Sequence, residues 1–252
     1  FGPPGLDSIC DYLGLFPEKP EAKRFGDGSV FYLYSNQAID QIESVTKNCA
    51  RYIVCLRDPV MASFSLHAQH VAFGWEPERD YLTALRRAEK ESATANPDPK
   101  LANVLNYARL YQYAPYLSRL LDLVEESRIF ISVMERDTHD TQGLYDRLHR
   151  FLAVSDRQVD YEIRVNEARR VGSDLIYRAL TSRGVLRFAQ LARRVVAPNG
   201  FGLKRPIRRI TEQERHIAYE TFRDDIIRTS NIAGFEPNLW QSGMQDPQRV
   251  AK

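Results

Sequence analysis

RYIVCLRDPVMASFSLHAQH, residues 51–70, changes character halfway along its length. Its first part, Tyr52 to Leu56, is apolar and contains β-branched and aromatic residues, which predicts a buried β-strand. Asp58 and Pro59 then suit the N-cap and first position of a helix. The stretch therefore predicts a strand that passes directly into a helix, with Arg57 at the junction.

Further helices and one further strand are predicted on both sides of this junction. Upstream, Ser35 is expected to cap a short helix. Downstream, a capping box is predicted at Thr211 to Glu214, and Trp240 is expected to fold back on the core. The full set is a helix with Ala38, Ile39, Ile42 and Val45 on its apolar face, a helix from Pro59 to about Phe73, a helix at 79–91, a helix at 101–124 kinked at Pro115, a strand at 128–134, a helix capped by Asp140, and a helix from Thr211 to near Gly234 with Ile217, Phe222, Ile226 and Ile227 on one face.

Alternating strands and helices predict an α/β fold with a parallel sheet. The chain has 252 residues, 43% of them hydrophobic, which is enough to bury a substantial core. We expect one domain over 1–252. The arginine-rich stretch at 157–209 is less regular, and we interpret it as a mobile or helical insertion.

The composition excludes several classes of protein. A net charge of +2 is too small for a typical nucleic-acid-binding domain. The three cysteines fit neither a disulfide scaffold nor a zinc site, which indicates a reducing compartment and a cytoplasmic protein. No apolar run approaches the roughly 20 residues of a membrane span, and no cluster has metal-ligand spacing. The chain begins without Met, and we expect further sequence before Phe1.

Arg57 and Ser65 are the candidate binding residues. An arginine at the carboxyl end of a parallel strand lies where open α/β sheets bind ligands, and its planar fork matches a phosphate. The helix after Pro59 adds free N–H groups and a partial positive charge, and Ser65 adds a hydroxyl. These groups predict a phosphate pocket. A capped helix beside a structural arginine explains the same residues equally well at this point.

Several segments, in order along the chain, resemble the sulfotransferases that use 3′-phosphoadenosine 5′-phosphosulfate, in their bacterial and heparan-type branch. In that family a strand ends in Arg-Asp-Pro, and a serine follows eight positions after the arginine, as Ser65 follows Arg57. The other similar segments are GDGSVFYLYSNQAIDQI, YQYAPYLSRLLDLVEESRIFISVMERD, LHRFLAV and KRPIRRITEQERHIAYETFRDDIIRTSNIAGFEPNLW.

This resemblance implies a P-loop-NTPase-like three-layer core with a central parallel sheet and an extensive helical periphery. It also implies in-line transfer of a sulfonyl group, without a metal, to a hydroxyl or amine of a small-molecule, carbohydrate or lipid acceptor. Arg57 and Ser65 would bind the 3′-phosphate of the donor. Lys204 and Arg205, in NGFGLKRP, are the best candidates for a late basic loop at the same site. Neither the acceptor nor the oligomeric state follows from the sequence.

The chain also departs from the family. The loop Gly-x-x-Lys-x-Gly-Thr-Thr, which holds the 5′-phosphosulfate, has no match here, and we expect it, its lysine and the catalytic base to precede Phe1. Asp27 and Gly28 replace the usual glutamate and lysine. His67 and His70 are alternative bases, but structural or acceptor-cleft roles are favoured. A nucleotide kinase-like phosphotransferase and a non-catalytic nucleotide-binding protein of the same fold remain open.

Overall fold

The computed structural model describes residues 12, 14–16, 22, 24–29, 31–35, 37–73, 75–90, 106–155 and 208–241. The chain divides into two compact units. Unit 1 comprises Phe1–Asp58, Gln112–Tyr161 and Arg223–Lys252, and unit 2 comprises Pro59–Tyr111 and Glu162–Phe222. The expectation of one domain stays a prediction. The stretch predicted as an insertion lies almost wholly outside the described residues.

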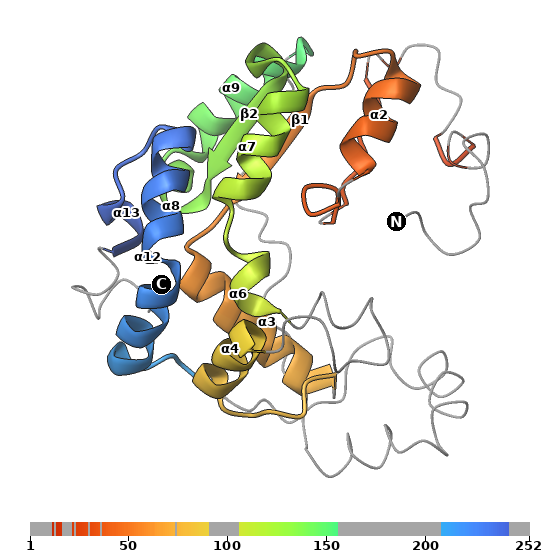
Figure 1. Cartoon of the computed structure of the whole chain (residues 1–252). Coiled ribbons are helices and arrows are strands. Elements are labelled where there is room, and N and C mark those ends of the chain that lie inside the picture. The colour runs from red at the N-terminus through yellow and green to blue at the C-terminus, as the bar shows by residue number, and fades with distance from the viewer. Residues whose placement is uncertain are drawn as a thin grey trace, which may run out of the picture. The chain divides into compact units, whose positions relative to one another are not determined.

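Unit 1 is built on a parallel pair of strands. β1 (Tyr52–Leu56) and β2 (Ile129–Val133) run side by side, with Leu56 opposite Val133 (Figure 1). Parallel strands need a long crossover, and the chain from α3 to α7 provides it. Both predicted strands and the parallel pairing are therefore confirmed, and the fold is mixed α/β. The three-layer core stays a prediction.

The other elements of unit 1 are mostly short helices. They are α2 (Ala38–Thr46), α7 (Ala114–Leu123), the 3-10 turn η1 (Glu126–Arg128), α8 (Met134–Asp137), α9 (Thr141–Leu152), the second half of α12 (Glu212–Ala233) and α13 (Asn238–Gln241). The fully buried side chains of unit 1 include Leu56, Val133, Leu117, Ile226 and Trp240. The carboxyl ends of both strands and Trp240 are therefore part of the core of this unit. The predicted return of Trp240 to the core is confirmed.

The predicted helix starts are largely confirmed. The Ser35 hydroxyl oxygen accepts the N–H of Ala38 at 3.1 Å, at the start of α2. The Asp140 carboxylate accepts the N–H of Gly143 at 2.9 Å. The Thr211 hydroxyl oxygen and the Glu214 carboxylate accept each other's backbone N–H at 3.2 and 2.9 Å, as a capping box requires.

Three sequence predictions about helices are wrong. Val45 and Ile227, expected on buried faces, are 43% and 45% exposed. Ile227 follows the buried Ile226, and neighbouring residues point about 100° apart around a helix. The helix expected at 101–124 is not one kinked helix, because α6 (Tyr107–Leu110) ends before α7 begins. Pro115 lies in the first turn of the new helix, where a missing N–H costs nothing.

Unit 2 is helical in its described part. It contains α3 (Pro59–Phe73), α4 (Tyr81–Lys90), α6 and the first half of α12, and α3, α4 and α6 lie close together (Figure 1). Its fully buried side chains include Val60, Tyr81, Leu85, Tyr107 and Phe222. α3 has the bounds that the sequence predicts and begins at Pro59. The chain therefore passes from strand to helix at Arg57 and Asp58, as predicted.

Candidate functional site

Arg57 follows the last residue of β1, at the carboxyl end of the parallel pair. Its side chain is partly buried, and its Nε is buried with no hydrogen-bond partner among the described residues. Such an orphaned buried donor usually costs about 1–3 kcal/mol. Among the described residues, therefore, no carboxylate pairs with Arg57 through its Nε. Within the described part of the chain this N–H is therefore available to a ligand, and anion binding by Arg57 stays a prediction.

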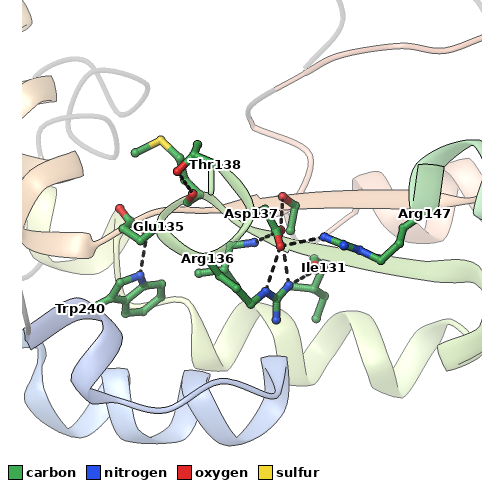
Figure 2. A network of polar contacts seen from close by, with 10 residues as sticks. Ile131, Glu135, Arg136, Asp137, Thr138, Arg147 and Trp240 are labelled. Atoms are coloured by element: carbon green, nitrogen blue, oxygen red, sulfur yellow. Dashed lines mark hydrogen bonds and ion pairs between the residues drawn. The ribbon is translucent and has the colours of Figure 1, made fainter. Parts of the chain in front are cut away.

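The peptide group that joins Arg57 to Asp58 is hydrogen-bonded on both sides. Its carbonyl oxygen accepts the Tyr113 hydroxyl at 3.1 Å. Its N–H donates to Glu135 Oε1 at 3.0 Å. The other oxygen of Glu135 accepts the indole N–H of Trp240 at 2.9 Å, a contact drawn in Figure 2. Tyr113, just before α7, and Glu135, on α8, thus fix the backbone at the end of β1, and Trp240 on α13 holds Glu135.

Asp137, beside this peptide on α8, is a buried carboxylate with a full set of donors (Figure 2). It accepts the Ser132 hydroxyl at 2.8 Å and the Val133 N–H at 2.9 Å. Arg136 Nε and Arg147 reach it at 3.0 Å. Burial raises the pKa of Asp137, but the hydrogen bonds from Arg136, Ser132 and Val133 outweigh it and hold the pKa below its ordinary value. Asp137 therefore joins β2, α8 and α9 and is unsuited to accept a substrate proton.

Ser65 lies in unit 2, in the second turn of α3. It is exposed and makes no hydrogen bond within the described residues, so its hydroxyl can donate to a ligand. Ser63, by contrast, is buried; its hydroxyl lies 3.1 Å from the Val60 carbonyl and 2.7 Å from the Tyr81 hydroxyl. Of the two serines, only Ser65 is available. Arg57 belongs to unit 1 and Ser65 to unit 2.

His67 and His70 are buried in unit 2 and have partners. His67 Nε2 lies 2.9 Å from the Glu78 carbonyl oxygen. His70 Nδ1 lies 3.1 Å from the Tyr107 hydroxyl, which also donates to Glu76 at 3.1 Å. Burial lowers the pKa of His70, and this effect exceeds the opposing one of Glu76. Both histidines have the contacts that the favoured structural interpretation expects.

The remaining candidates contribute less. Lys204 and Arg205 lie outside the described residues. The Asp27 carboxylate accepts the hydroxyls of Tyr12, at 2.8 Å, and Tyr32. No group of three or more His, Cys, Asp or Glu side chains among the described residues is placed to hold a metal ion. Across the same part of the chain, every helix is too short or too polar to cross a bilayer.

Sequence reasoning missed two residues of the junction, Tyr113 and Glu135. Tyr113 was one of several tyrosines in a helical pattern, which more often indicates a core position. Glu135 directly follows the strand predicted at 128–134, and no sequence signal connects it to Arg57. Both lie more than 50 residues from Arg57 along the chain, and nothing in a single sequence indicates such a contact.

Comparison with known proteins gives support at the level of the fold. No protein-family model matches the chain, and no curated protein does. Among solved structures, the crystal structure of a sulfotransferase from Alicyclobacillus acidocaldarius is similar, with a TM-score of 0.65 and 17% sequence identity. The similarity covers 93% of this chain and 74% of that one. The protein therefore has a mixed α/β fold like that of a bacterial sulfotransferase.

Proposed function

We propose that the protein is a sulfotransferase that moves a sulfonyl group from 3′-phosphoadenosine 5′-phosphosulfate to a hydroxyl or amine. The observation that carries the proposal is the buried Nε of Arg57 at the carboxyl end of β1, which has no partner among the described residues. The similarity of fold to a sulfotransferase supports it. The collinear motifs that include Arg57 and Ser65 agree with both.

In this proposal Arg57 binds the 3′-phosphate of the donor. A guanidinium offers two parallel N–H groups to phosphate oxygens, and the buried Nε is one of the donors available for such a fork. In unit 2, Ser65 and the free N–H groups in the first turn of α3 remain predicted contributors to binding of the 3′-phosphate. Lys204 and Arg205 remain predicted contributors.

The chemistry is an in-line displacement at sulfur. The acceptor oxygen or nitrogen forms a bond to sulfur, while the bond from sulfur to the 5′-phosphate oxygen breaks and adenosine 3′,5′-bisphosphate leaves. The acceptor proton goes to a base that the described residues do not identify. Such transfers depend mainly on positioning and on stabilising charge on oxygen. A fixed 3′-phosphate contributes by holding the donor in line. The acceptor is a small molecule, a carbohydrate or a lipid.

Calorimetric titration tests the donor site. We expect adenosine 3′,5′-bisphosphate to bind more tightly than 5′-AMP, because only the former carries the 3′-phosphate. Arg57→Ala should weaken bisphosphate binding by about 1.5–3 kcal/mol, roughly 10- to 150-fold, as for other charge-assisted hydrogen bonds. Arg150→Ala is the matched control, because Arg150 is an exposed arginine on α9 in the same unit. Binding indifferent to the 3′-phosphate would refute the proposal.

The same titrations separate the alternatives. A nucleotide kinase-like enzyme would bind ATP more tightly than adenosine 3′,5′-bisphosphate. A non-catalytic protein would bind the bisphosphate with the expected dependence on Arg57 but would transfer no labelled sulfonyl group to any of a panel of phenols, sugars and lipids. Transfer to one member of the panel would establish the activity and identify the class of acceptor.

A further inference from the structure

Two hydrogen bonds hold the Arg57–Asp58 peptide group. They grip opposite sides of one planar unit: the Tyr113 hydroxyl holds the oxygen at 3.1 Å, and Glu135 holds the N–H at 3.0 Å. Because the peptide is planar, fixing both sides limits rotation about the Arg57 ψ and Asp58 φ angles. These angles set the direction in which the backbone leaves Arg57.

Each of the two holding residues is itself held. The backbone N–H of Tyr113 donates to Asp225 Oδ2 at 2.7 Å, and Asp225 is buried on α12. Glu135 accepts the indole N–H of the fully buried Trp240 at 2.9 Å (Figure 2). The contacts therefore come from residues anchored in the core of unit 1.

The backbone carbonyl of Arg57 is hydrogen-bonded, but the Nε of its guanidinium is not, within the described residues. This Nε is buried without a partner in the described part of the chain, so this N–H is available to a ligand. Ordering a backbone residue carries an entropic cost. A peptide group already fixed in the folded protein spares the ligand this cost, which is preorganisation in its usual sense.

We infer that Tyr113 and Glu135 are positioning residues that set Arg57 for the 3′-phosphate without touching it. This inference rests on the proposed function. It assigns a role to two side chains outside the Arg-Asp-Pro motif, and it predicts that their loss acts only through Arg57.

The test is a double-mutant cycle read by titration calorimetry. Tyr113→Phe removes the hydroxyl and keeps the ring. Glu135→Gln leaves one oxygen to accept a hydrogen bond in place of two. Each should weaken adenosine 3′,5′-bisphosphate binding about 2- to 10-fold, as expected for one hydrogen bond. Binding of 5′-AMP should not change, and neither substitution should add to the loss in an Arg57→Ala background.

Tyr52→Phe is the matched control. It removes the Tyr52 hydroxyl bond to Glu43, 2.8 Å long, at the opposite end of β1 from Arg57. It should leave both affinities unchanged, and thermal unfolding of each variant would identify any loss of folded protein.

The outcomes distinguish this inference from the proposed function. If the unsubstituted protein binds 5′-AMP as tightly as the bisphosphate, the donor site and the positioning role both fail. If the 3′-phosphate matters, but Tyr113→Phe and Glu135→Gln bind like Tyr52→Phe, the positioning role alone is refuted. It is also refuted if their losses persist in full without Arg57. Losses that appear only for the bisphosphate, and only with Arg57 present, would support it.

Discussion

Asp225 on α12 accepts the backbone N–H of Tyr113 at 2.7 Å, at the point where α7 begins. The same carboxylate accepts the N–H of Ala114 at 3.1 Å and the hydroxyl of Thr229 at 3.1 Å. A negative charge beside the start of a helix is favourable, and the first N–H groups of α7 lack partners of their own. A residue more than 100 positions away therefore stabilises the start of α7.

The raised pKa of Asp225 should make the free energy of unfolding depend on pH. Burial raises its pKa, against the opposing hydrogen bonds from Tyr113 and Ala114. The folded protein therefore holds this proton more tightly than the unfolded chain does, and the free energy of unfolding should fall as pH rises from the ordinary aspartate pKa, about 3.9, through the raised value. Urea unfolding between pH 3.5 and 7 should show wild type losing stability relative to Asp225→Asn. An unchanged difference would contradict this.

The contribution of Asp137 to the free energy of unfolding should depend on pH in the opposite direction. Its pKa in the folded protein lies below the ordinary value, so its contribution is present above the aspartate range and is lost as pH falls through the lowered value. We expect Asp137→Asn to cost about 1.5–3 kcal/mol near pH 7, because bonds to two arginines are lost or weakened. The cost should shrink on acidification. The same urea series measures it, and a cost that does not depend on pH would argue against an ionised Asp137.

Removing the Arg57 head group should not destabilise the ligand-free protein. Its Nε is orphaned among the described residues, so Arg57→Met should leave the free energy of unfolding unchanged or raise it by up to about 1 kcal/mol. Arg128→Met is the matched comparison. Arg128 bonds the buried Glu43 at 2.5 and 3.0 Å, so its loss should cost about 2–3 kcal/mol. Chemical unfolding of both variants without nucleotide checks this, and equal losses would show that Arg57 has a structural role.

In unit 2, Arg87 and Glu76 should behave as a coupled pair. The Glu76 side chain is fully buried and accepts from Arg87 at 2.7 Å and from Tyr107 at 3.1 Å. Arg87→Met leaves that carboxylate without its counter-charge and should cost about 3 kcal/mol. The double variant with Glu76→Gln should recover part of the loss, because no buried charge remains. Thermal and urea unfolding measure both, and strictly additive losses would contradict the coupling.

Local chemistry was enough to predict the strand-to-helix junction. Apolar β-branched residues gave β1, Asp58–Pro59 marked the start of α3, and Thr211 with Glu214 marked the start of α12. These signals depend on residues close together in the chain, so the bounds of α3 agree with the structure. The parallel pairing also followed, because parallel neighbours need a long crossover and the helices predicted between the two strands supply one.

The surroundings of Arg57 depend on contacts between distant residues. Two side chains meet the end of β1, those of Tyr113 and Glu135. Asp225 supports Tyr113, and Trp240 supports Glu135. These residues come together only because α7, α8, α12 and α13 return to the same core. The break between α6 and α7 has the same cause, since Asp225 supplies the missing cap. Motif spacing identified Arg57 and Ser65 as candidate binding residues. The fold determined which backbone atoms are held and left the Nε of Arg57 without a partner in the described part of the chain, because hydrogen bonding depends on distance in space and not along the sequence.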